Sequence, residues 1–230
     1  MSKNVVIAID GPAGAGKSTV AKHLAQMLNY VYVDTGAMYR AITFLVLRNN
    51  VQDNIDEIIK VAEDVDIKLQ FEDGITRVFI NGEEVTDNIR TPEVNSKVSD
   101  VSKIPEVRKQ MVKIQRSLGN DTNLIAEGRD TTTVVFPDAT IKVFLTASLE
   151  ERVKRRYKEL LEKGMQITID EVRENIIQRD KIDSSRKVSP LKKADDAVEI
   201  DSTNMTIPDE IHKILDMIEK ATGMNLRQDF

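Results

Sequence analysis

The sequence contains no cysteine, which excludes a disulfide framework and any thiolate chemistry. It also lacks long apolar runs, and none approaches the roughly 20 residues that a membrane-spanning helix needs. The first predicted strand follows directly after Met1-Ser2-Lys3-Asn4, which leaves no room for a signal peptide. We therefore expect a protein that resides in the cytoplasm and has no membrane partner.

Positive charge is in deficit, since 33 Lys and Arg residues stand against 38 Asp and Glu residues and give a net charge of −5. This balance argues against a general binder of nucleic acids or membrane surfaces, so an anionic ligand must meet a local cluster of cations. Core-forming residues are abundant, because 40% of the 230 residues are hydrophobic. A chain of this length suits one domain with a small insertion.

The most informative segment lies between a predicted buried strand at Val5–Ile9 and a predicted amphipathic helix at Thr19–Leu28. Its spacing is Gly-x-x-x-x-Gly-Lys-Ser, the phosphate-binding P-loop, in the strand-to-helix context that the motif requires. Glycines let backbone N–H groups converge on phosphate oxygens, and the helix dipole adds to the attraction. We expect Lys17 to reach the β- and γ-phosphates and Ser18 to bind Mg²⁺. The predicted ATP-binding residues are Gly11, Pro12, Ala13, Gly14, Ala15, Gly16, Lys17, Ser18 and Thr19.

Strand and helix patterns alternate over much of the remaining sequence. This alternation predicts an α/β fold in which a mainly parallel sheet has helices on both faces. The candidate parallel strands are 5–9, 30–33, 123–126, 141–145 and 197–200.

Capping signals indicate where the later helices begin. Ser148 and Glu151 form a predicted capping box before a charged helix that ends near residue 164. Thr168 and Glu171 repeat this pattern before a helix that continues to about residue 179. Pro208 is expected in the first turn of the last helix.

One segment interrupts the alternation of strands and helices. Residues 65–71, 76–80 and 83–85 alternate with period two, and turn signals at Asp73-Gly74 and Asn81-Gly82 separate them. This pattern predicts an antiparallel β insertion at about residues 63–92. The α/β core would then comprise residues 1–62 and 93–223, followed by a tail at 224–230.

A P-loop binds the phosphoryl donor but does not identify the second substrate. Ligands of open α/β sheets gather at the carboxyl ends of the strands, and residues 34–40 and 127–130 follow two predicted strands. Each cluster contains glycine and an arginine, Arg40 or Arg129, that could bind a phosphate through two hydrogen bonds. The alternative is that each arginine pairs with a neighbouring carboxylate on a solvated loop.

Two further stretches, residues 151–156 and 178–187, are rich in cations. Phosphoryl transfer needs cations around the migrating group, and this need assigns a functional role to Arg152, Arg156, Arg179 and Arg186. Charge runs on helices are usually solvated, which is the interpretation for Lys154, Arg155 and Lys158.

Together, the P-loop and the segments 34–40, 127–137 and 179–191 closely resemble bacterial cytidylate kinases, a family of nucleoside monophosphate kinases. The Gly-Arg-Asp…Val-Val-Phe-Pro-Asp block is the most specific part, because a P-loop alone occurs in many NTPases. The resemblance covers nearly the whole chain and includes the β insertion. It implies a five-stranded parallel P-loop kinase fold with a mobile lid at about 150–190. It also implies a monomer that transfers a phosphoryl group from ATP to CMP or dCMP.

The same resemblance implies which residues form the nucleoside part of the acceptor site. Ser99, Arg108 and Asp130 resemble the residues that read cytosine. Thr35 and Tyr39 resemble residues that line the same pocket, although some family members have Ser in place of Thr35. A carboxylate that faces the amino group of cytosine would repel the corresponding oxygen of uracil, which favours CMP over UMP.

The resemblance also implies the contacts of the acceptor phosphate and ribose. Arg40, Arg129 and Arg186 resemble the residues that hold the phosphate. Arg179 and Asp183 resemble the ribose contacts. The predicted catalytic residues are Lys17, Arg129, Arg152, Arg156 and Arg186, and Ser18 is the predicted metal ligand. Glu127 stands where some relatives have Asp, which leaves open whether it helps to position Mg²⁺.

The chemistry of the residues agrees with direct in-line transfer. The acceptor phosphate is largely dianionic at neutral pH and needs no general base. His23 and His212 lie on predicted helices away from every cluster, so neither is expected to act as one. Two alternatives stay open: a P-loop kinase for another acceptor, such as UMP or a small hydroxylated metabolite, and a P-loop NTPase switch. The sequence has no guanine-selecting Asn-Lys-x-Asp motif that would support a switch.

Overall fold

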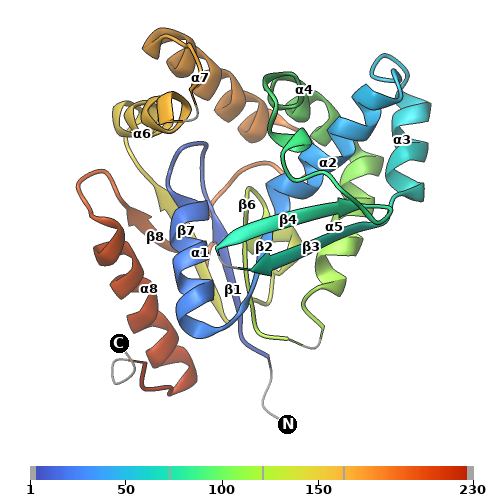
Figure 1. The fold of residues 1–230 in the computed structure, drawn as a ribbon. Coiled ribbons are helices and arrows are strands. Elements are labelled where there is room, and N and C mark those ends of the chain that lie inside the picture. Colours follow the sequence, from blue (N-terminus) through green and yellow to red (C-terminus); the bar gives the residue numbers. More distant parts are fainter. Residues whose placement is uncertain (1–3, 73, 121, 163, 227–230) are drawn as a thin grey trace.

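Five parallel strands form the central sheet of the structure, a computed structural model that describes residues 4–72, 74–120, 122–162 and 164–226 (Figure 1). The strand order is β2-β6-β1-β7-β8, so β1 lies in the middle of the sheet. The α/β class and all five predicted strands are confirmed. The strands are β1 (Val6–Asp10), β2 (Val31–Asp34), β6 (Leu124–Gly128), β7 (Ile141–Thr146) and β8 (Val198–Asp201).

Each strand extends one or two residues beyond its predicted end. The added residues are polar or small, so they do not continue the apolar run that marks a strand in the sequence. Their backbones nevertheless remain in the ladder, where Asp10 pairs with Gly128 and Asp34 pairs with Glu127. Polar side chains therefore line the carboxyl end of the sheet.

Helices cover the sheet and bury its strands. α1 and α8 pack on one face, where Val20, Leu24, Ile211 and Ile214 join the apolar side chains of β1 and β7. The residues that follow α5 and η2 cover β2 and β6 on the other face. The helices are α1 (Lys17–Leu28), α2 (Thr35–Arg48), α3 (Ile55–Asp64), α4 (Pro92–Ser102), α5 (Pro105–Ser117), α6 (Leu149–Glu162), α7 (Ile169–Ser185) and α8 (Ile207–Thr222), with the 3-10 turn η1 (Asn88–Arg90) and the π-helical turn η2 (Thr131–Val135).

Side-chain caps begin the later helices. α7 starts with the predicted capping box, in which Glu171 N donates to Thr168 Oγ1 and Thr168 N donates to the Glu171 carboxylate. The box predicted at Ser148 is only half formed. Glu151 N donates to Ser148 Oγ at 3.3 Å, but the Glu151 carboxylate accepts from Arg155 Nε at 3.0 Å.

The ends of two helices differ in how well the sequence predicts them. α7 continues to Ser185, past its predicted end near residue 179, and this extension places Asp183 inside the helix. The apolar period fades in this stretch because polar and charged residues dominate it. α8 carries Pro208 in its first turn as predicted, after a second capping box that begins at Thr206.

The β insertion is confirmed as an antiparallel sheet of three strands in the order β3-β4-β5. Val78 and Ile80 of this sheet are fully buried in a core shared with α2, α3, α4 and α5. The predicted turn at Asp73 lies outside the described residues, as does residue 121. The strands are β3 (Ile67–Glu72), β4 (Ile75–Ile80) and β5 (Glu83–Glu84).

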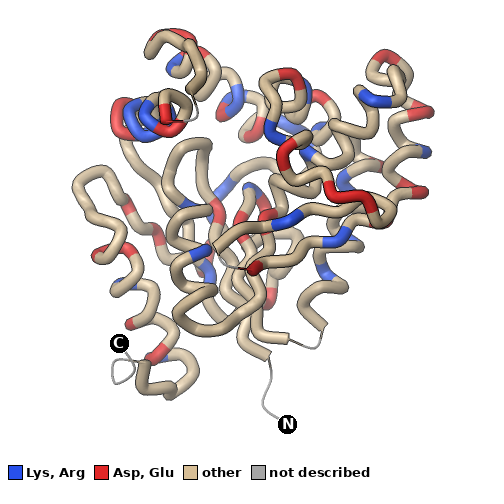
Figure 2. Tube along the Cα trace, in the orientation of Figure 1, with Lys and Arg blue, Asp and Glu red and all other residues tan. Residues whose placement is uncertain are grey.

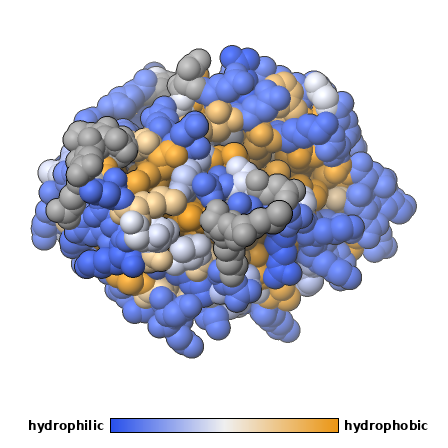
Figure 3. All heavy atoms as spheres, turned by 90° about the horizontal axis from the view of Figure 1, so that it is seen from below, coloured by the Kyte–Doolittle hydropathy of each residue, from blue (hydrophilic) through white to orange (hydrophobic). Residues whose placement is uncertain are grey.

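The two ends of the sheet differ in surface character. The face at the amino ends of the strands is mostly hydrophilic, with smaller apolar areas between (Figure 3). Basic residues of α6 and α7 lie at the opposite end (Figure 2). Acidic residues of the same two helices lie among them, so the charge at this end of the sheet is mixed (Figure 2). None of the helices in the described part of the chain is long and apolar enough to cross a membrane.

Candidate active site

The loop between β1 and α1 has a backbone suited to phosphate. Gly14 and Gly16 have φ angles of 77° and 94°, in the left-handed region that favours glycine. At Gly11, a Cβ atom would lie 1.9 Å from the carbonyl oxygen of Leu145, so the position has no room for a side chain. α1 begins at Lys17, earlier than predicted, and the glycine at its N-cap has no side chain to cap the first turn. The first N–H groups of the helix are therefore available to an anion.

Lys17 is the cation of this loop. Its Nζ donates to the carbonyl oxygen of Pro12 at 2.8 Å, and the side chain is buried. Burial, followed by repulsion from Arg129, lowers the pKa of Lys17 to about 7, although the nearby Glu127 and Asp10 carboxylates act in the opposite direction. A phosphate beside this ammonium group would favour its protonated form and raise the pKa again.

A hydroxyl and a carboxylate that fit a hydrated Mg²⁺ ion meet at the start of α1. Ser18 Oγ donates to Glu127 Oε1 at 2.7 Å, and Tyr32 OH donates to the same oxygen at 3.3 Å. Glu127 is buried at the carboxyl end of β6. The described residues hold no cluster of three or more His, Asp or Glu side chains that could bind a metal by themselves. This set suits Mg²⁺, which takes most of its ligands from phosphates and water.

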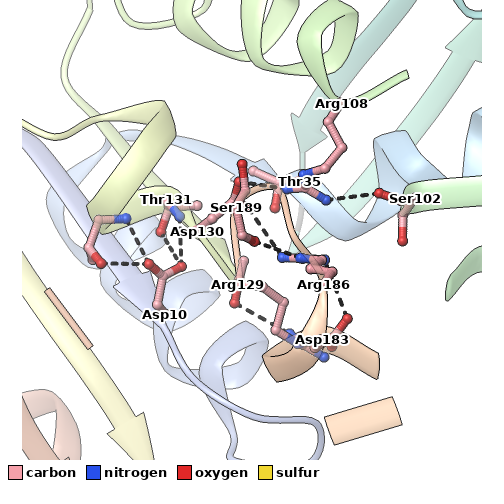
Figure 4. Close-up of polar contacts among 12 residues, drawn as sticks. Asp10, Thr35, Ser102, Arg108, Arg129, Asp130, Thr131, Asp183, Arg186 and Ser189 are labelled. Carbon is pink, nitrogen blue, oxygen red and sulfur yellow. Dashed lines mark hydrogen bonds and ion pairs between the residues drawn. The ribbon is translucent and has the colours of Figure 1, made fainter. Parts of the chain in front are cut away.

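A ladder of alternating charges leads away from the P-loop (Figure 4). Arg129 Nε donates to Asp183 Oδ2 at 2.8 Å, and Arg186 Nη1 lies 3.4 Å from Asp183 Oδ1. Arg186 Nη2 lies 4.0 Å from Asp130 Oδ1, and Arg108 Nη2 donates to Asp130 Oδ2 at 2.5 Å. The ladder joins the residues between β6 and η2 to α5 and to the end of α7, and all five residues are among the predicted acceptor contacts.

Several buried donors of this region lack a hydrogen-bond partner in the described part of the chain. Arg179 Nε, Arg186 Nη2 and Tyr39 OH are buried and have no hydrogen-bond partner among the described residues. Burial, followed by repulsion from Arg129, lowers the pKa of Arg179 to about 10. Buried donors without partners are costly, and a bound phosphate or hydroxyl would satisfy them.

The predicted base-reading residues lie on α4, on α5 and, in the case of Asp130, directly before η2. Arg108 is 2% exposed and also donates to the Ser102 carbonyl oxygen at 3.1 Å. Its guanidinium lies over the Tyr39 ring, 4.9 Å from the ring centroid. Ser99 is buried on α4, one turn before Ser102. Arg108 is thereby fixed on three sides, and it holds Asp130 in place.

Arg40 and Thr35 bind neighbouring protein groups. Arg40 Nη2 donates to Asp34 Oδ2 at 2.9 Å, which is the pairing with a neighbouring carboxylate that the sequence left open. Thr35 Oγ1 donates to the Glu127 carbonyl oxygen at 2.7 Å. Asp34 also accepts from Ala37 N and so caps α2. These contacts hold the start of α2 against β6.

Helices α6 and α7 contact the P-loop directly. Arg152 Nη1 donates to the Ala13 carbonyl oxygen at 3.0 Å and to Asp180 Oδ2 at 2.5 Å. Asp180 Oδ1 accepts from Ala13 N at 3.2 Å. Arg156 instead pairs with Glu159 on its own helix at 2.7 Å. Sequence reasoning does not find Asp180, because the residue stands within a mixed charge run that gives no signal of its own.

The expectation that Arg155 lies on a solvated face is wrong. Its guanidinium donates to Ser202 Oγ at 3.0 Å, to the Ser202 carbonyl oxygen at 2.8 Å and to the Ala15 carbonyl oxygen at 3.4 Å. Arg155 therefore ties α6 to the P-loop and to the residue after β8. Lys154 and Lys158 are exposed, as predicted.

Comparisons with known proteins show a family and a fold to which this chain is similar. The family model described as cytidylate kinase matches residues 7–220. The chain is 52% identical to a cytidylate kinase of Caldanaerobacter subterraneus subsp. tengcongensis, over 95% of this chain and 96% of the relative. It is 48% identical to a cytidylate kinase of Caldicellulosiruptor saccharolyticus, over 96% of this chain and 98% of the relative. A crystal structure of an uncharacterized protein from Eubacterium ventriosum shares the fold at 14% identity, with a TM-score of 0.52 over 95% of this chain and 99% of that one.

Proposed function

This chain belongs to the cytidylate kinase family, and we propose that it transfers the γ-phosphoryl group of ATP to CMP or dCMP, giving ADP and CDP or dCDP. The observation that carries the proposal is the ladder of Arg129, Asp183, Arg186, Asp130 and Arg108 beside the P-loop. It offers cations for an acceptor phosphate and a paired carboxylate for a base. A P-loop switch would need neither.

On the donor side, backbone N–H groups and Lys17 would hold the ATP phosphates. Ser18 would bind Mg²⁺, and Glu127 would hold water on the ion. The ion would neutralise charge on the transferring phosphate. Arg152, already at the Ala13 carbonyl, and Arg156 would add positive charge from the lid.

On the acceptor side, Arg40, Arg129 and Arg186 would bind the CMP phosphate. Its oxygen is the nucleophile and is largely deprotonated at neutral pH, because the second phosphate pKa is about 6. Catalysis therefore rests on alignment and on charge stabilisation, with no proton to be removed by the protein. Asp183 and Arg179 would contact the ribose.

The base would be selected at the Arg108–Asp130 pair. The Asp130 carboxylate would accept from the cytosine amino group, with Ser99 and Tyr39 lining the pocket. Uracil places a carbonyl oxygen at the amino position. Two hydrogen-bond acceptors, this oxygen and the Asp130 carboxylate, would then face each other with no donor between them. This mismatch supports CMP over UMP as the acceptor. The monomeric state and the cytoplasmic location expected from the sequence stay predictions.

A steady-state assay of ADP release with Mg²⁺ and ATP tests the proposal. CMP and dCMP are expected to accelerate ADP release far above basal hydrolysis, with UMP and AMP well behind. A Lys17→Met variant serves as the inactive control. Faster turnover with UMP or AMP than with CMP would overturn the proposed acceptor. Equal ADP release with and without any monophosphate would favour an NTPase instead.

A further inference from the structure

One buried carboxylate, that of Asp10, joins the P-loop to the segment 129–132, which follows β6 and includes the start of η2. Asp10 is the last residue of β1, directly before the P-loop, and it is fully buried. Its Oδ1 accepts from Thr131 N at 2.8 Å and from Thr131 Oγ1 at 2.7 Å. Its Oδ2 accepts from Thr132 N at 2.7 Å and from Thr132 Oγ1 at 2.6 Å. Figure 4 shows Asp10 pointing from β1 toward the loop that carries Arg129 and Asp130.

These bonds hold a backbone that has little intrinsic preference for its conformation. Thr131 and Thr132 begin the π-helical turn η2, in which Val135 N donates to the Asp130 carbonyl oxygen at 3.1 Å. π-turns are rare and often occur at functional sites. Asp130, directly before the turn, has φ −146° and ψ 22°. The orientation of Arg129 and Asp130, which precede the turn, therefore depends on the contacts that hold the turn in place.

The four donors around Asp10 suit an ionised carboxylate, whose oxygens only accept. Two of its partners are amide N–H groups, which can only donate, and one of them faces each oxygen of Asp10. Burial raises the pKa of Asp10, and the hydrogen bonds from Thr132 and Thr131 oppose that effect. An Asp10→Asn substitution would keep the shape but set an NH₂ donor against one of the two amides.

We propose that Asp10 is a positioning residue: through Thr131 and Thr132 it fixes Arg129 and Asp130 relative to the P-loop and so sets the preference for CMP over UMP. The inference rests on the proposed CMP kinase activity. Asp10 reaches the reaction only through the residues that it holds. A β1 carboxylate thus acts on the acceptor side although it borders the donor loop.

The test compares the wild-type protein with Asp10→Asn and with the double variant Thr131→Val/Thr132→Val. The kcat/KM ratio of CMP to UMP is measured because it does not depend on the fraction of folded enzyme. Asp10→Asn is expected to lower this ratio by about tenfold, since a shifted Asp130 loses its bond to cytosine. The double variant keeps both amide bonds and is expected to change the ratio in the same direction by a smaller factor. The KM for ATP should change much less than the KM for CMP.

Ile218→Ala is the matched control for lost stability, because Ile218 is buried in α8 within the apolar cluster on the α1 face of the sheet. It should lower the melting temperature and leave the ratio unchanged. An unchanged ratio in Asp10→Asn would overturn the inference.

Amide hydrogen exchange provides a readout that needs no substrate. Exchange in residues 129–135 should accelerate in Asp10→Asn more than in Ile218→Ala, and equal exchange would also overturn the inference. A wild-type protein that does not use CMP would overturn the proposed function instead, and the exchange data would still decide the role of Asp10.

Discussion

Lys17 illustrates how one residue of this site is prepared for an anion. Its ammonium group is buried, and Arg129 repels it more than any other charged side chain. Its pKa of about 7 lies below the ordinary lysine value of about 10.4. Below pH 7 the group is protonated in both the folded and the unfolded states. The burial of its charge then lowers the free energy of unfolding by the full amount. Between about pH 7 and 10 the unfolded state holds more protons, and the free energy of unfolding gained from this group rises with pH.

The same shift predicts that ATP binding takes up protons. At pH 8 most Lys17 side chains of the free enzyme are neutral, and the triphosphate restores the charge, so uptake should approach about one proton per ATP. Calorimetry with a non-hydrolysable ATP analogue, in buffers that differ in ionisation enthalpy, measures this uptake. Lys17→Arg keeps a permanent charge and should bind with little proton uptake. Equal uptake by the two proteins would assign the protons to another group.

Asp130 carries the prediction on base selection. Asp130→Ala is expected to lower kcat/KM for CMP by more than tenfold relative to UMP, because cytosine loses the acceptor for its amino group. It also leaves the buried Arg108 without its carboxylate, at a cost of about 3–5 kcal/mol in stability. The ratio of the two substrates separates these effects, and Asp130→Asn is the control of equal size. A ratio like that of the wild-type protein in Asp130→Ala would place the base elsewhere.

At the scale of elements, α6 and α7 form a pair of helices, and both contact Ala13 of the P-loop. Gly14 permits this approach, since a Cβ atom there would lie 3.0 Å from the Arg152 carbonyl oxygen. Arg152 and Asp180 then clamp Ala13 from its carbonyl and its N–H side. A phosphate that uses the Ala13 N–H must compete with the Asp180 carboxylate.

Arg152→Met tests whether α6 supplies charge to the reaction. It is expected to lower kcat by about 10²-fold, with a smaller change in the KM for CMP, because the cation is needed most as charge develops on the transferring group. Lys154→Met is the matched control on the same helix, since Lys154 is exposed, and its kcat should stay within about twofold of the wild-type value. Equal losses in both variants would show a general effect of charge instead.

The sequence predicts those elements whose side chains follow a period or a local motif. β1 and the capping box of α7 follow from an apolar run and from a Thr-x-x-Glu spacing. The site residues Arg108 and Asp130 follow from resemblance, and their pairing needs the packing of α5 against η2. The extension of α7 and the contact of Arg155 with Ser202 depend on tertiary partners that no local pattern records.

Asp10 marks the limit of prediction from sequence most clearly. It stands directly before a recognised motif, yet its partners Thr131 and Thr132 are 121 and 122 residues away. Only the parallel pairing of β1 with β6 brings the two segments together. Sequence spacing therefore finds each half of the site but not the connection between them.

At the scale of the whole molecule, β3 connects two hydrophobic cores, the one around α2 to α5 and the one between α1 and the central sheet. Its inward residues reach different cores in turn: Ile67 packs with α2 to α5, and Phe71 packs beside the P-loop helix α1. Phe71 meets the Tyr32 ring edge-on with centroids 5.1 Å apart, and Tyr32 OH donates to Glu127. The boundary predicted at residues 63–92 stays a prediction, but the insertion shares its packing with the core.

This packing predicts that the insertion and the core unfold together. Phe71→Ala is expected to lower the free energy of unfolding by about 2 kcal/mol, because a half-buried ring and an aromatic pair are both lost. Denaturant unfolding followed by circular dichroism should keep a single transition, shifted to lower denaturant with an unchanged slope. Ile75→Ala, at an exposed position of the same hairpin, should leave the midpoint nearly unchanged. An unchanged midpoint in Phe71→Ala would mean that the contact with Tyr32 contributes nothing to stability, and two separate transitions in the wild-type protein would mean that the insertion folds independently.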